Sequence, residues 1–259
     1  MPYIALIQNE WMKLNSKKQT ALFGLFLLGV IGISAFVVRF SMSSLADRMG
    51  YTDFAGYMVS GLGLLIPLFG IVIASQIVAD EYRDGTIRQL LIRPASRAAV
   101  LWSKYATLLI VIVCAYAVLF VLSLGCGLLV FGTAAAHGGD TPLLLFKQIM
   151  YRIPGAIFEA TVAFAVGAIS RSVGLAISIG ILLSFSSSLI AALLARYSWS
   201  KYLVFANLDL AVYDSSPELR GPGPLLPGMT FGFSLTVLLA YLVLLYIITL
   251  LFFTKRDVH

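Results

Sequence analysis

Charged residues are scarce in this sequence. They make up 12% of its 259 residues and hydrophobic residues make up 60%, whereas a soluble domain averages about 25% charged and about 45–50% apolar. Cysteine is scarce too: Cys114 and Cys126 are twelve residues apart in one apolar run, and a helix would separate them by about 18 Å, beyond disulfide reach. This composition argues against a soluble enzyme, a disordered protein and a nucleic-acid-binding domain.

Groups that catalysis would need are missing as well. Three serines at 186–188 lie in an apolar stretch, but a nucleophilic serine needs a general base, and the two histidines, His137 and His259, fall outside the apolar stretches. No Cys/His cluster has metal-ligand spacing, and there is no G-x-x-x-x-G-K-[S/T] phosphate loop. We therefore expect that the chain is not itself an enzyme and binds no metal or cofactor directly.

Long apolar runs are what the sequence has in abundance, and its mean hydropathy is +0.95. Six runs reach the roughly 17–25 residues that a helix needs to cross a bilayer. They cover about 20–38, 57–79, 105–131, 153–169, 173–195 and 230–253. No long stretch alternates with period two, which argues against an outer-membrane barrel. The sequence predicts an all-α membrane protein with six transmembrane helices in a single domain, residues 1–259.

The Lys and Arg residues between these runs indicate the orientation. Eleven of the 18 fall on the side that also carries both termini, and the loops on that side are shorter. Positively charged loops stay in the cytoplasm. We therefore expect a multi-pass protein of a bacterial plasma membrane with both termini in the cytoplasm. The net charge of +6 then reflects loops that face anionic membrane lipid, and no nucleic-acid partner is expected.

The segment at 2–18, before the first run, is amphipathic. Its apolar residues recur on one face of a helix, at Ile4, Ile7, Trp11 and Leu14. A Trp on the apolar face and two lysines at the end are typical of a helix that lies in the membrane interface. We expect such an interfacial helix; the alternative is an ordinary cytoplasmic lead-in.

The loop at 80–97, between the second and third runs, has an internal order of its own. Gly85-Thr86 is typical of a turn followed by a helix N-cap, and Pro94 marks the helix end. Between them lies one apolar face, formed by Ile87, Leu90 and Leu91. A short helix cannot bury such a face alone, so we expect it to dock on another protein or on the bilayer. The alternative is a basic loop that only meets the positive-inside rule.

The outer loop at 196–229 has two parts. Its first part mixes aromatic and polar residues up to Tyr213, as is typical of the membrane–water boundary. Its second part contains Gly-Pro pairs and cannot be helical. Either a partly re-entrant helix or a surface cap fits this pattern.

Small residues recur every four positions along the fifth run, at Ala176, Gly180, Ser184, Ser188 and Ala192. Such a ridge lets another helix approach closely, and serine can form hydrogen bonds across the contact. The neighbouring helix could belong to the same chain or to a second copy, and the pattern leaves both readings open.

Glu159 is the one carboxylate expected inside a span, in the fourth run. An ionisable group at that depth is a functional candidate, here for translocation of a substrate or ion. Arg152, two helical turns earlier, offers the other interpretation, a structural ion pair.

The order Glu81, Gly85-Thr86-Ile87, Leu90-Leu91 and Pro94, followed by Arg97 and Lys104, resembles the permease subunits of type-2 ATP-binding-cassette exporters, the bacitracin and lantibiotic-immunity permeases in particular. The resemblance covers the whole chain, with the amphipathic N-terminal helix, six spans and cytoplasmic termini. Large extracellular domains found in lipoprotein-release relatives are absent from this sequence.

In that family the short helix after span two is a coupling helix that seats in a cleft of a separate ATPase. The resemblance gives this role to Glu81, Gly85, Thr86, Ile87, Leu90, Leu91 and Pro94. It also implies two ATPase subunits, which bind ATP and Mg, and a second permease copy that meets this one through spans one and five. The implied activity is export of an amphipathic substrate, such as an antimicrobial peptide, a drug or a lipid-linked compound. The alternative function is an ion-coupled secondary transporter that uses Glu159.

Overall fold

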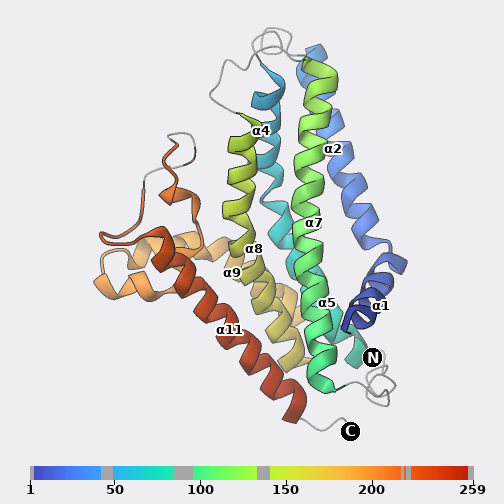
Figure 1. Cartoon of the computed structure of the whole chain (residues 1–259), viewed down its shortest axis with the longest axis vertical. Coiled ribbons are helices and arrows are strands. Elements are labelled where there is room, and N and C mark those ends of the chain that lie inside the picture. Colours follow the sequence, from blue (N-terminus) through green and yellow to red (C-terminus); the bar gives the residue numbers. More distant parts are fainter. Residues whose placement is uncertain are drawn as a thin grey trace.

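The computed structural model describes residues 3–41, 49–83, 96–132, 141–216, 219 and 223–255. Within these residues the chain is all-α, as the sequence predicts (Figure 1). The eight α-helices are α1 (Tyr3–Ser16), α2 (Gln19–Ser41), α4 (Tyr51–Leu62), α5 (Leu65–Arg83), α7 (Arg97–Phe131), α8 (Pro142–Ser170), α9 (Val173–Leu194) and α11 (Phe231–Lys255). Three short 3-10 helices follow α9: η1 (Ser198–Tyr202), η2 (Val204–Asn207) and η3 (Ala211–Tyr213).

Six of these helices, namely α2, α5, α7, α8, α9 and α11, are long and apolar enough to cross a membrane. Each overlaps one of the six predicted runs, so the prediction of six spans is confirmed. The 35 residues of α7 extend about 52 Å, well beyond a hydrocarbon core of about 30 Å. Both ends of the chain lie at the same end of the molecule (Figure 1). That this end faces the cytoplasm is still a prediction from the loop charges.

Local sequence explains the tight connection between α8 and α9. Arg171 adopts a left-handed conformation, with φ of 57°, and ends α8. The next residue, Ser172, is the N-cap of α9, and its side chain accepts a hydrogen bond from the Leu175 amide. A serine cap satisfies one of the free N–H groups at a helix start. Two residues between the helices, Arg171 and Ser172, are therefore enough to reverse the chain.

The second predicted run is not one helix, and here the prediction is wrong. It is divided into α4 and α5 at Gly63, whose amide still donates to the Val59 carbonyl. Pro67 lies in the first turn of α5, and a proline ring clashes with the carbonyl four residues earlier, which here belongs to Gly63. Glycine at 61 and 63 further weakens the helix. The break is therefore encoded locally, by a glycine at 63 and a proline four residues later.

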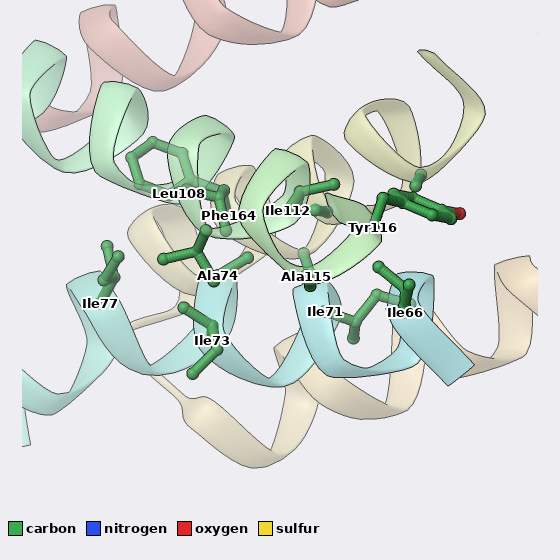
Figure 2. Packing of buried hydrophobic residues seen from close by; sticks show 14 of the residues in the cluster. Ile66, Ile71, Ile73, Ala74, Ile77, Leu108, Ile112, Ala115, Tyr116 and Phe164 are labelled. Atoms are coloured by element: carbon green, nitrogen blue, oxygen red, sulfur yellow. The ribbon is translucent and has the colours of Figure 1, made fainter. Parts of the chain in front are cut away.

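The core of the bundle is built around α5. Of its apolar window, 61% is buried, and it packs against α7, α8 and α9. Figure 2 shows Ile66, Ile71 and Ala74 of α5 gathered with Ile112 of α7 and Phe164 of α8. By contrast, most of the apolar side chains of α2, α9 and α11 are exposed or half-buried. In a bilayer these side chains face lipid and need no protein partner.

The N-terminal segment forms a helix, α1, as predicted, and it packs on the bundle with a face that only partly overlaps the predicted apolar stripe. Leu6, Glu10 and Leu14 are buried against the protein. Ile4 and Trp11, from the predicted apolar stripe, are 69% and 39% exposed. The helix is turned this way because the carboxylate of Glu10 has partners inside the bundle, described below. The outward Ile4 and Trp11 suit contact with the membrane interface, which stays a prediction.

The small-residue ridge on α9 is divided between two environments. Ala176 and Gly180 are buried, and a Cβ atom on Gly180 would lie 2.6 Å from Ile71 Cγ2 and 3.3 Å from Ala163 Cβ. These two residues therefore allow α9 to pack closely on α5 and α8 of the same chain. Of the two readings, packing within the chain is the one observed for this half of the ridge. Ser188 and Ala192 are exposed and Ser184 is half-buried.

Gly180→Leu should lower the stability of the chain by about 1–3 kcal/mol, because the larger side chain overpacks the contact with Ile71. The matched control is Gly174→Leu on the same helix, where an added Cβ has nothing within 4 Å. Thermal unfolding in detergent measures both variants. Equal melting temperatures for the two would contradict the packing described here.

Candidate functional site

Four charged side chains, Glu10, Lys13, Glu81 and Lys104, meet where α1 crosses the ends of α5 and α7; we call them the ion cluster. Lys104 Nζ lies 2.8 Å from Glu10 Oε2 and 2.6 Å from Glu81 Oε1, and it donates to the Ile77 carbonyl at 3.1 Å. Lys13 Nζ lies 2.9 Å from Glu10 and 3.0 Å from Glu81. Each carboxylate thus bridges both ammonium groups, and all three donors of Lys104 are used.

Electrostatics in the ion cluster favour the charged forms. Burial raises the pKa of the Glu10 carboxyl, but Lys104 and Lys13 outweigh it, so this pKa lies below its ordinary value. Burial lowers the pKa of Lys13, but Glu10 and Glu81 outweigh it, so this pKa lies above its ordinary value. Lys104 has no exposed surface. A buried charge of this kind is tolerated only with partners, so α1 is held in place by the need to neutralise Lys104.

The ion cluster sits at both ends of the loop assigned to docking. Glu81 is in the last turn of α5, and Lys104 is in the second turn of α7. Lys17 adds a 2.7 Å ion pair to Asp80, and Arg97 donates to the Thr254 carbonyl at the end of α11. The residues that lead into and out of the loop are therefore tied to α1 and α11.

Of the residues that the family resemblance assigns to ATPase coupling, the structure describes one. Glu81 binds two lysines of its own chain, as given above. Gly85, Thr86, Ile87, Leu90, Leu91 and Pro94 lie outside the described residues. The sequence pattern missed Glu10, although a signal was present: a charged residue stands four positions from both Leu6 and Leu14, on the face that proves to be buried.

A second candidate site is a cavity of ≈ 380 Å³ beside the break between α4 and α5; we call it the break cavity. Its walls come from the break itself, from α7, α8 and α9, and from the segment of η2 and η3. The charged side chains among its described lining residues are Arg152, Glu159 and Asp209. Arg152 and Glu159, singled out from the sequence, are thus brought to one cavity.

Arg152 supplies hydrogen-bond donors to the carbonyl groups at the C-terminal end of α4. Its Nη1 donates to the Val59 carbonyl at 3.0 Å and to the Ser60 carbonyl at 3.2 Å. The Tyr116 hydroxyl donates to the Gly63 carbonyl at 3.4 Å. The last carbonyls of a helix lack partners within it, and in an apolar bundle they must find them elsewhere. Arg152 and Tyr116 supply these hydrogen-bond partners, so contacts with α7 and α8 stabilise the break.

Glu159 does not pair with Arg152, so the structural ion pair expected as one alternative is not formed between these two described residues. The Arg152 guanidinium is drawn to the carbonyls of α4 instead. Glu159 is 9% exposed, and its Oε2 atom is buried with no hydrogen-bond partner. The Ser184 side chain of the α9 ridge lies next to it. An unsatisfied buried acceptor in a native fold calls for an explanation.

The described part of the outer loop caps the break cavity through Leu208, Asp209 and Ala211. Residues 196–216 contain three short 3-10 helices and no α-helix; the re-entrant segment and the surface cap both stay predictions. Asp214 anchors the loop to α8, since its Oδ2 accepts from the Tyr151 hydroxyl at 2.6 Å. Hydrogen bonds from Tyr151 and Ser216 hold the pKa of Asp214 below its usual range.

Comparison with known proteins places this architecture among bacterial membrane proteins. The family model described as "Protein of unknown function (DUF2705)" matches residues 12–259. The chain is 30% identical to the "Uncharacterized membrane protein YdbK" of Bacillus subtilis (strain 168) over 255 residues, which cover 96% of this chain and 100% of the relative. It is 33% identical to the "Uncharacterized protein YhcI" of the same organism over 222 residues, or 80% of this chain and 67% of the relative.

Lys104→Met should release α1 from the bundle, because it leaves two buried carboxylates with one lysine; losing a partner of a buried pair costs about 3–5 kcal/mol. The measurement is maleimide labelling of a cysteine placed at the buried Leu14, after both native cysteines are replaced. The control is Lys17→Met, which removes a half-exposed pair worth at most about 1 kcal/mol. Unchanged labelling in Lys104→Met would contradict the role given to the ion cluster.

Proposed function

The chain belongs to the DUF2705 family and is a multi-pass membrane protein, and we propose that it is the membrane-spanning permease subunit of an ATP-binding-cassette exporter. Its cargo in this proposal is amphipathic: an antimicrobial peptide, a drug or a lipid-linked compound. The energy comes from ATP hydrolysed by a separate subunit, because this sequence has no phosphate loop of its own.

The observation that carries the proposal is the ion cluster at the base of the loop at 84–95. A docking helix can transmit movement only if its attachment to the spans is stiff. Here the two ends of the loop are joined through the buried Lys104, which binds Glu81 on one side and Glu10 of α1 on the other. An ordinary surface loop needs no such attachment, since exposed ion pairs add little to stability. The stiff base therefore supports docking on a partner.

Helix α5 connects the ion cluster with the break cavity. Glu81 is near one end of α5, and the break at Gly63 is at the other. The sixteen or so residues between them span about 24 Å. A shift of the loop base would move α5 against α7, α8 and α9, and so would change the cavity at its far end. ATP-driven movement of the coupling loop thus has a direct mechanical path to the space where cargo would bind.

The proposed assembly has two copies of this chain and two ATPase subunits. Both termini and the coupling loop lie in the cytoplasm, where the ATPase binds ATP and Mg. The second copy approaches through α2 and α9, whose large apolar side chains are exposed. The exposed Ser188 and Ala192 provide the small-residue contact there, while Ala176 and Gly180 serve packing within the chain.

A second candidate function has one observation in its favour. Glu159 lines the break cavity and has a buried oxygen without a partner, and intramembrane carboxylates relay protons in pumps and transporters. The alternative is therefore an ion-coupled secondary transporter that needs no ATPase. The exporter accounts for the loop pattern and the ion cluster as well, so we favour it.

Leu90→Asp or Leu91→Asp should abolish transport and weaken binding to the proposed ATPase subunit roughly a hundredfold, since an unpaired carboxylate buried in an interface costs several kcal/mol. Membrane insertion should be unchanged. Gln89→Asp is the matched control, because it adds the same charge off the apolar face. Normal co-purification of the Leu90→Asp and Leu91→Asp proteins with the ATPase would show that docking is assigned wrongly.

Energy coupling separates the two candidate functions. In cells with high ATP, export should continue when an ionophore removes the proton gradient, because an ATP-driven exporter does not draw on it. Glu159→Gln should leave this ATP dependence intact, whatever it does to substrate preference. Export that stops with the ionophore, stops in Glu159→Gln and ignores ATP depletion would replace the exporter with the ion-coupled transporter.

A further inference from the structure

We propose that the break cavity is a binding site for the primary ammonium group of an amphipathic amine, with Glu159 as its anchor. The inference deepens the proposed function, on which it rests, by naming the class of cargo. The starting point is the Glu159 Oε2 atom, which is buried and lacks a hydrogen-bond donor. The other buried charged side chains among the described residues, namely Glu10, Asp80, Lys104 and Asp214, form ion pairs. Glu159 differs from them, and its open oxygen marks a place for a ligand.

The charge of the cavity selects a cation. Two carboxylates, Glu159 and Asp209, and one guanidinium, Arg152, are the described charged groups in its wall. The guanidinium is already engaged, since its Nη1 donates to the Val59 and Ser60 carbonyls. Asp209 is exposed, and its Oδ1 accepts from the Ala211 amide at 3.0 Å. The Ser184 side chain lies next to the Glu159 carboxyl group, but the buried Glu159 Oε2 atom has no hydrogen-bond donor. The described wall therefore has one carboxylate more than it has guanidinium groups, and a buried anionic acceptor that suits a positive group.

The hydrogen-bonding chemistry of the Glu159 carboxylate further narrows the class of cation that fits. A carboxylate oxygen accepts hydrogen bonds, and a charged donor forms the stronger bond. A primary ammonium has both charge and N–H donors, whereas a quaternary ammonium has charge alone. Tyr116, which belongs to the buried apolar cluster shown in Figure 2, is also one of the residues that line the cavity. An aromatic wall adds cation–π attraction.

The surroundings suit an apolar tail on that amine. Leu64, Pro67 and Leu208 also line the cavity, and the bundle around it is apolar. The volume of ≈ 380 Å³ falls in the range of small-molecule sites. The tail would extend among the spans while the ammonium is held at Glu159. A lipid with an ethanolamine headgroup and a free alkylamine share this chemistry.

The test is equilibrium binding of dodecylammonium to the full-length chain in phosphatidylcholine nanodiscs, without any ATPase. Wild-type protein should bind dodecylammonium more tightly than dodecyltrimethylammonium. Glu159→Gln should weaken dodecylammonium binding roughly ten- to hundredfold, because a hydrogen bond between charged groups is lost. The control, Asp53→Asn, removes a carboxylate of α4 outside the cavity and should leave the affinity unchanged. Competition by phosphatidylethanolamine would identify a lipid headgroup as the natural ammonium, and its absence a free amine.

Two results would overturn the proposal: equal affinity of the wild-type and Glu159→Gln proteins for dodecylammonium, or preferential, Arg152-dependent binding of dodecyl sulfate. Because the assay contains no ATPase, its outcome is independent of the exporter assignment. Ammonium binding that depends on Glu159 in a chain with no ATP-driven transport would reject the proposed function and keep the site. ATP-driven export of another cargo with no ammonium binding would reject only the site.

Discussion

A single buried positive charge organises one end of this molecule. Lys104 has no exposed surface, and an isolated ammonium in an apolar interior would lose its charge or unfold the region around it. Carboxylates from two other helices, Glu10 of α1 and Glu81 of α5, form ion pairs with Lys104. The position of α1, its rotation and the stiffness of the loop base all follow from this requirement. Without Lys104, α1 would lose the Glu10–Lys104 ion pair and keep the Lys13–Glu81 ion pair to the bundle.

The bilayer imposes a second constraint, which explains the opposite end of α5. No water is available in hydrocarbon to satisfy a free carbonyl, so a helix that breaks there needs donors from its neighbours. Arg152 and Tyr116 provide them for Val59, Ser60 and Gly63. Because Arg152 donates to these carbonyls, Glu159 has no cation partner among the residues that the structure describes. The broken helix and the open carboxylate are thus two consequences of one arrangement.

The sequence alone identified several residues of the candidate sites, but not the groups that these residues contact. Glu159 and Arg152 stand out because ionisable groups are rare in apolar runs, and the structure brings both to the break cavity. The ion pair between them, one of the interpretations left open by the sequence, is not formed, because an i, i+7 spacing on one helix says nothing about the carbonyls of α4 that compete for the guanidinium. Glu10 was overlooked for a similar reason: a lone carboxylate on a short helix takes its meaning from Lys104, 94 residues away.

The sequence by itself determined the six spans, the N-terminal helix and the Ser-Arg-Ser reversal between α8 and α9, because hydrophobic length, periodicity and capping act within a few residues of chain. The break in the second span is also encoded by nearby residues, Gly63 and Pro67, although the long apolar run gave no sign of it. The tertiary structure alone decided which face of α1 is buried, that Gly180 packs on Ile71, and that Glu159 is left with an open oxygen. Each of these depends on where separate helices meet, and helix contacts are set by the shape and charge of both surfaces together.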